Sequence, residues 1–131
     1  MPATYQKIKV TEDLLNSEPN SYFVYGDNMN RQGLDGAASM RNHPRCIGFV
    51  TRKPPEVKPS ANFKVEEYAK TFFQQLTQLS DIVKKAPHQK FYISKVGSGA
   101  ANKYYIWERI IRANLVSELG EYDNVVFCWE E

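Results

Sequence analysis

The sequence predicts an α/β domain, a single three-layer unit with a mainly parallel or mixed sheet and helices on both faces. Short apolar runs typical of buried strands alternate along the chain with segments whose apolar residues recur every three or four positions, as in helices. Two glycine-bearing turns, at residues 26–38 and 97–102, each follow a predicted strand and precede a predicted helix. Strands that alternate with helices in this way usually pair in parallel.

Size and composition indicate one ordinary globular domain over residues 1–131. Hydrophobic residues make up 42% of the chain and charged residues 24%, while the 13% aromatic share predicts a core or pocket rich in rings. Cys46 and Cys128 lack the spacing of a zinc site, so we expect reduced thiols, no metal and no cofactor. Without a signal peptide or a long apolar run, the chain is expected to be cytoplasmic and to have no membrane partner.

The first half of the chain is expected to hold three strands and two short helices. The strands are residues 5–10, 21–25 and 46–51, each rich in apolar, aromatic or β-branched side chains. Between the first two strands, Thr11 is placed to cap a short helix with acidic residues in its first turn. Between the last two, the small residues of segment 35–42 predict a second short helix, which ends before Pro44.

The second half is expected to hold two longer helices and two strands. Three prolines make residues 52–60 an extended loop, which could form a lid or a rim. Apolar residues in steps of three and four predict helices over residues 63–86 and 103–119, and Gly120 is a natural stop for the second one. The strands are residues 91–96, which lead directly into Gly97, and residues 125–129.

Both glycine turns are expected at the carboxyl ends of parallel strands, where α/β sheets bind their ligands. Glycine permits positive φ angles and lets backbone N–H groups approach a phosphate, and a following helix N-terminus adds partial positive charge. A diphosphate could bridge two such turns. Alternatively, the turns need small residues only for tight packing. The first turn has neither Gly-Lys-Ser/Thr nor Gly-x-Gly-x-x-Gly, which excludes the Walker and dinucleotide-binding types of site.

These motifs resemble those of the macro domain superfamily of ADP-ribose binders, and more closely its small, often phage-encoded relatives. Gly26-Asp27-Asn28, Gly33-Leu34-Asp35-Gly36-Ala37-Ala38 and Gly97-Ser98-Gly99-Ala100-Ala101 carry the likeness in order. The resemblance implies a macro domain-like fold and ADP-ribose or a related nucleotide diphosphate as the ligand. It also implies hydrolysis of ADP-ribosyl linkages or ADP-ribose phosphoesters, on a modified protein or nucleic acid, as the candidate activity.

The resemblance also assigns ligand contacts, residue by residue. The distal ribose would be contacted by Asn28, Gly33, Gly36 and Ala37. The diphosphate would be wrapped by the backbone amides of Gly97, Ser98, Gly99 and Ala100. Gly26 and Asn102, at the edges of the two turns, complete the set of candidate ligand-binding residues. The chain departs from the family in the late loop, where relatives often have another glycine, and in lacking an assignable acid for adenine near the N-terminus.

Asp27 and Asp35 are the candidate catalytic residues, because they are the only carboxylates inside the first turn. Either could orient the ribose hydroxyls, activate water or protonate a leaving group. Each also has a structural alternative. Asp27 could make an Asx-type turn bond, and Asp35 could cap a helix that starts at Gly36.

The charge distribution leaves two other functions open. The net charge is only +2, from 17 basic and 15 acidic residues, so the field of the whole molecule does not indicate a polyanion partner. Basic residues nevertheless gather in one segment, which holds Arg41, Arg45, Arg52, Lys53 and Lys58. One alternative is a non-catalytic nucleotide sponge, such as a phage counter-defence protein. The other is a nucleic-acid-binding module that uses this basic segment together with exposed tyrosines.

Overall fold

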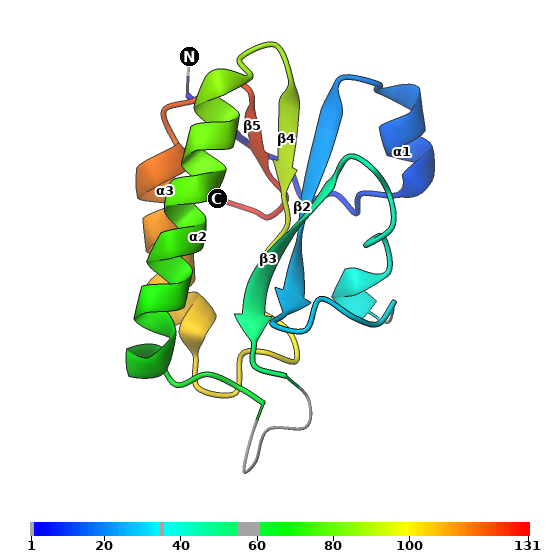
Figure 1. Cartoon of the computed structure of the whole chain (residues 1–131). Helices are drawn as coiled ribbons and strands as arrows, with labels where there is room; N and C mark the ends of the chain where they lie inside the picture. The colour runs from blue at the N-terminus through cyan, green and yellow to red at the C-terminus, as the bar shows by residue number, and fades with distance from the viewer. Residues whose placement is uncertain (1, 35, 55–60) are drawn as a thin grey trace.

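The computed structural model describes residues 2–34, 36–54 and 61–131, and it contains a five-stranded sheet in the order β1-β5-β4-β2-β3 (Figure 1). The strands are β1 (Thr4–Tyr5), β2 (Ser21–Asn28), β3 (Cys46–Arg52), β4 (Lys90–Ile93) and β5 (Val125–Phe127). All pairs of neighbouring strands run parallel. The predicted α/β class is therefore confirmed, with a fully parallel sheet.

Helices lie on both faces of this sheet, so the predicted three layers are also confirmed. The helical elements are α1 (Glu12–Ser17), the 3₁₀ turn η1 (Gly36–Ala38), α2 (Val65–Lys85), the π-helical turn η2 (Trp107–Ile111) and α3 (Arg112–Leu119). In Figure 1, α2 and α3 cover one face, and α1 lies on the other. In the described part of the chain, no helix combines the length and apolarity needed to cross a membrane.

The larger core fills the space between the sheet and the α2–α3 layer. Val24, Phe91 and Phe127 contribute from the strands, and Tyr68 and Phe72 contribute from α2, all of them buried. The burial of Tyr68 and Phe72 follows from the helical spacing of apolar residues in α2, which turns one stripe of the helix toward the sheet. This layer anchors the segments that carry the site.

A smaller core lies under α1 on the opposite face. It joins Val10 and Leu15 to Tyr92 of β4 and Val126 of β5. The predicted cap of α1 is confirmed, since Thr11 Oγ1 accepts a hydrogen bond from the Leu14 N–H at 3.1 Å.

The first two predicted strands have different bounds in the structure. The strand predicted at residues 5–10 is only Thr4–Tyr5, because its single partner β5 is three residues long and Gln6 N–H makes the last bond, to Phe127 O at 2.8 Å. The strand predicted at residues 21–25 continues to Asn28. The supposed turn Gly26-Asp27-Asn28 is therefore the end of β2, paired with Phe49, Val50 and Arg52 of β3.

Most of the remaining elements are shorter than predicted, whereas β3 continues past the predicted end at residue 51 to Arg52. The helix expected at residues 35–42 is one 3₁₀ turn followed by further turns, and Asp35 lies outside the described residues. The strands expected at residues 91–96 and 125–129 end at Ile93 and Phe127. The helix expected from residue 103 starts only at residue 106, because Tyr105 has a φ of 61°, which is incompatible with a right-handed helix. Residues 55–60 of the proline-rich loop also lie outside the described residues.

Candidate functional site

The strand order creates one crevice at the carboxyl edge of the sheet. β2 and β4 are neighbours, but the chain leaves β2 toward β3 on one side and leaves β4 toward β5 on the other. The two connections therefore diverge, and this kind of topological switch point is where open parallel sheets bind ligands. β4 pairs with β2 only as far as Val24, so residues 25–28 of β2 have a paired strand only on the β3 side.

A cavity of about 550 Å³ occupies this crevice. Its walls come from the ends of β2 and β3, from η1 and from the segment that follows β4. The predicted site residues that line it are Gly26, Asp27, Asn28, Gly36, Ala37, Gly97, Ser98, Gly99 and Ala100. The structure thus brings both glycine-bearing segments to one cavity.

Gly26 lies where the two segments approach each other. A Cβ atom built on Gly26 would lie 3.5 Å from Thr51 Oγ1, 3.8 Å from Gly97 N and 3.9 Å from Ala37 Cβ. These are ordinary contact distances, so a small residue here lets β2 touch η1, β3 and the late turn together.

Two predicted residues do not line the cavity. Gly33 has a φ of 93°, and its carbonyl accepts a hydrogen bond from Arg41 Nε at 2.9 Å. Asn102 instead fixes the start of the next helix. Its Oδ1 accepts from Trp107 N–H at 3.0 Å, and its Nδ2 donates to Glu108 Oε1 at 2.9 Å.

The late turn contains one glycine that the fold requires and one that it does not. Gly97 has a φ of 81°, a conformation that favours glycine, and a Cβ there would lie 2.6 Å from Ile111 Cδ1, so the end of the Ile111 side chain would have to shift. At Gly99 an added Cβ would meet nothing within 4 Å, and the backbone is not left-handed. Gly99 therefore borders open space in the cavity wall.

Several backbone N–H groups of this turn are unpaired. Ser98 N–H donates to Lys95 O at 3.2 Å, but within the described residues the N–H groups of Gly97, Gly99 and Ala100 have no acceptor. The Ala100 carbonyl accepts from Asn62 Nδ2 at 3.0 Å, which ties the turn to the segment before α2. The predicted helix N-terminus directly behind this turn is wrong, because residues 101–105 separate it from the helix.

Asn28 supplies an unused acceptor. Its Nδ2 donates to Gln32 O at 3.0 Å, whereas its Oδ1 is buried and has no hydrogen-bond partner among the described residues. A buried amide oxygen without a donor is costly. Because Asn28 lines the cavity, a ligand hydroxyl or amine is the natural donor.

Asp27 is held by two arginines. Its carboxylate, which is fully buried, lies 2.6 Å from Arg41 Nη1 and 3.4 Å from Arg31 Nη1, and its Oδ1 accepts from Asn28 N–H at 2.8 Å. A Cβ on Gly48 would lie 2.5 Å from Asp27 Oδ2, so glycine in β3 makes room for this cluster. The predicted Asx-type turn is wrong, because Asp27 is in a strand and its backbone bond goes to the next residue.

The basic segment is largely used within the fold. Arg45 donates to the carbonyls of Leu15, Glu18 and Ser21. Arg41 binds Asp27, Lys53 lies 2.8 Å from Glu67, and Arg52 Nε donates to Asn62 Oδ1 at 3.2 Å. Lys58 lies outside the described residues. The four described cations of this segment therefore do not form a free surface for a polyanion.

Several residues that line the cavity lie outside the predicted set of site residues. Phe23, Thr51, Arg52 and Lys95 all line the cavity. Arg52 is the last residue of β3. Its position directly after an apolar run could have indicated that it lies at the carboxyl edge of the sheet, where the site is expected. Phe23 lies inside a strand, and its exposure to the cavity depends on which strands are neighbours.

Two further hollows adjoin the cavity around Lys95. One of about 300 Å³ is lined mainly by apolar groups, among them Ile8, Val10, Phe23 and Met40. The other hollow has a volume of about 420 Å³ and is lined by Trp107 and Trp129. Their rings pack edge to face, with the ring centroids 4.9 Å apart.

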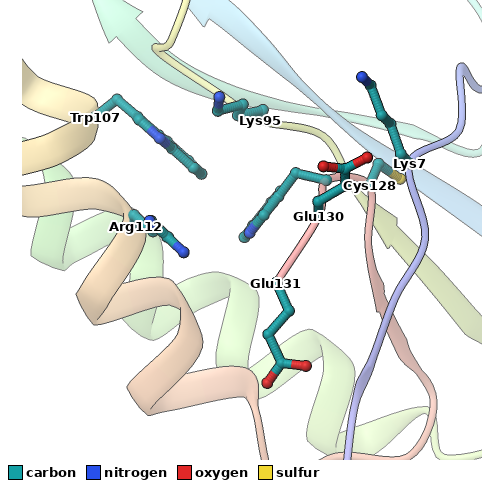
Figure 2. Close-up of a pocket in the computed structure, with 8 residues that line it drawn as sticks. Lys7, Lys95, Trp107, Arg112, Cys128, Glu130 and Glu131 are labelled. Carbon is teal, nitrogen blue, oxygen red and sulfur yellow. The ribbon is translucent and has the colours of Figure 1, made fainter.

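Figure 2 shows Lys7, Lys95 and Arg112, which line this second hollow from three different segments together with Glu130 and Glu131. Cys128 also lines it, and burial raises the pKa of its thiol to about 12. A thiol with that pKa stays protonated at neutral pH, which excludes it as a nucleophile there.

The fold and the cavity define a parallel α/β domain with a crevice at its topological switch point. The chain belongs to a family of unknown function (DUF7831), whose family model matches residues 5–102. The matched segment includes both glycine-bearing segments of the cavity. No curated protein matches the chain. No solved structure matches it either.

Proposed function

We propose that this chain is a macro domain-like protein that binds ADP-ribose, or a closely related nucleoside diphosphate, in the cavity between β2 and β4. One observation carries the proposal. Two glycine-bearing segments about 70 residues apart line a single cavity at the switch point of a parallel sheet. Its volume of about 550 Å³ lies within the range of small-molecule sites.

The late turn is suited to the diphosphate. The unpaired N–H groups of Gly97, Gly99 and Ala100 are donors that a phosphate oxygen can accept from at short range. Arg52 and Lys95 add positive charge to the same walls. Backbone donors held in place by packing bind an anion without ordering long side chains, which keeps the entropic cost of binding low.

The other parts of the ligand find matching surfaces. The unpartnered Oδ1 of Asn28 can accept a hydrogen bond from a ribose hydroxyl. The small residues Gly36 and Ala37 leave room for the sugar beside β2. The adjoining apolar hollow shares Phe23 with the cavity and offers a slot for a planar base.

The geometry favours binding over hydrolysis by Asp27. A general acid or base must reach the reacting group, but the Asp27 carboxylate is already fixed by Arg41, Arg31 and a backbone N–H. Asp27 therefore holds the loop after β2 and shapes the cavity. Of the functions that the sequence leaves open, a non-catalytic nucleotide sponge fits this arrangement best.

A thermal-shift titration with ADP-ribose tests the proposal. Ligand at about 100 times Kd should stabilise the wild-type protein by about 2.7 kcal/mol, and the melting temperature should rise accordingly. Gly99→Leu should remove the shift, because its side chain projects into open space at the cavity wall without clashing with the fold. Ala113→Leu, at an exposed position of α3, is the matched control and should keep the full shift.

Two results would overturn the proposal. One is a melting temperature that ADP-ribose, ADP and related diphosphates all leave unchanged. The other is a folded Gly99→Leu variant with an undiminished shift. A third result would replace the sponge by a hydrolase. In that case the protein would release ADP-ribose from a modified peptide, and Asp35→Asn would lose this activity while still binding ADP-ribose.

A further inference from the structure

We propose that a second surface, formed by Lys64, Lys103, Tyr104, Tyr105 and Arg109, binds single-stranded nucleic acid. We call it the tyrosine–cation surface. It surrounds a hollow of about 270 Å³ between the beginning of α2 and the segment that leads into η2. It does not include the basic segment at residues 41–58, and it does not depend on what the cavity between β2 and β4 binds.

Three cations and two tyrosines line this hollow. Lys64 Nζ lies 5.8 Å and Lys103 Nζ 5.5 Å from the centre of the Tyr104 ring, while Arg109 Cζ lies 6.0 Å from the centre of the Tyr105 ring. These contacts hold the long side chains against rigid aromatic groups, so their charges remain gathered at one place. Among the described residues that line this hollow, Glu66 is the one acid.

The charges of the surface are available to a partner. Among the described residues, Lys64, Lys103 and Arg109 make no ion pair, and all three are exposed. This distinguishes them from Arg41 and Lys53, whose charges are neutralised within the fold. A small net charge of +2 is compatible with such a local concentration.

Tyr105 is the most informative residue of the surface. The residue is 60% exposed, and its φ of 61° places a bulky residue in the left-handed region, where glycine or asparagine costs less. Neither core packing nor the backbone favours tyrosine at this position. A strained backbone that displays an exposed ring is a feature of binding sites, where the ring has a function outside the fold.

The combination of groups favours a nucleic acid strand with unpaired bases. Such strands are bound by cations that contact the phosphates and by aromatic rings on which the bases stack. The exposed Tyr105 ring offers a stacking platform with Arg109 beside it, and Lys64 and Lys103, which contact the Tyr104 ring, line the same hollow and can contact the phosphates. A fully paired duplex does not present free base faces, so stacking on Tyr105 selects single strands.

Fluorescence anisotropy with a labelled twelve-residue oligodeoxythymidine tests the proposal. Binding should weaken with salt with a slope of about −2 on a log–log plot, as three neutralised phosphates predict. Tyr105→Gly should weaken binding about fivefold or more through lost stacking. The same variant should melt no lower than wild type, because glycine relieves the left-handed backbone. Lys103→Gln with Arg109→Gln should reduce the slope.

The matched control removes two exposed cations from the last turn of α2, the helix whose beginning borders the tyrosine–cation surface. Lys84→Gln with Lys85→Gln should leave the affinity for the oligonucleotide unchanged. The proposal is overturned by absent binding at low salt, by an affinity that Tyr105→Gly leaves intact, or by a control variant as weak as the double variant of the surface. Tighter binding of a duplex than of the single strand would also overturn it.

Discussion

At the scale of single residues, the most consequential difference from the sequence prediction concerns Asp27. The residue type and its place in the motif suggested catalysis, but its side chain is buried and paired with Arg41, fourteen positions along the chain. No local pattern reveals such a partner, because the contact depends on the loop after β2 folding back. Asn102 is a second case, since its side chain is committed to Trp107 and Glu108.

Asp27→Asn should therefore destabilise the protein strongly. The change leaves the Arg41 guanidinium, whose side chain is only 12% exposed, without its counter-charge, and breaking a buried ion pair typically costs about 3–5 kcal/mol. Urea unfolding followed by circular dichroism measures this loss. Glu67→Gln, which removes the exposed partner of Lys53, is the control and should leave the unfolding midpoint nearly unchanged. Equal midpoints for the two variants would contradict the structural role of Asp27.

At the scale of elements, the sequence predicts the kinds of structure well and their ends poorly. The alternation of strands and helices, the cap at Thr11 and the long helix α2 all follow from local patterns. The ends depend on pairing between distant segments. β1 stops where β5 offers no further partner, and β2 continues through Gly26 because β3 pairs with it to Arg52. The late helix starts after Tyr105 because the φ angle of Tyr105 is positive, which no sequence pattern predicts.

The late turn gives a prediction at this scale, because its two glycines have different roles. Gly97→Ala should lower the free energy of unfolding by about 2 kcal/mol or more, since it combines a left-handed backbone with an overlap against Ile111. Gly99→Ala should change stability little, because its Cβ meets open space. Chemical denaturation of both variants measures the difference. A turn that tolerates alanine equally at both positions would contradict the geometry described here.

At the scale of the whole molecule, one continuous stretch of chain contributes to both proposed surfaces. Residues 97–101 line the cavity, and residues 103–105 begin the tyrosine–cation surface directly afterwards. Asn62 joins them to the segment before α2 through its bond to Ala100 O. A nucleotide in the cavity and a nucleic acid strand on the neighbouring surface would therefore be close to each other.

The location of the cavity could be predicted only in part. Two glycine turns at carboxyl strand ends indicate a shared edge of the sheet, and the structure places both there. The strand order, which puts β2 beside β4 and creates the switch point, is set by tertiary packing. It cannot be predicted from the local periodicity of apolar residues. For the same reason the sequence did not predict that Phe23 and Thr51 line the cavity.

An NMR titration of the ¹⁵N-labelled protein is the most direct test of the proposed binding of ADP-ribose in the cavity between β2 and β4. We predict that the amide signals of residues 26–28 and 97–101 shift together and saturate, with the unpaired N–H groups of Gly97, Gly99 and Ala100 moving most. A spectrum that ADP-ribose leaves unchanged, or shifts confined to the hollow beside Trp129 or to the tyrosine–cation surface, would contradict this proposal.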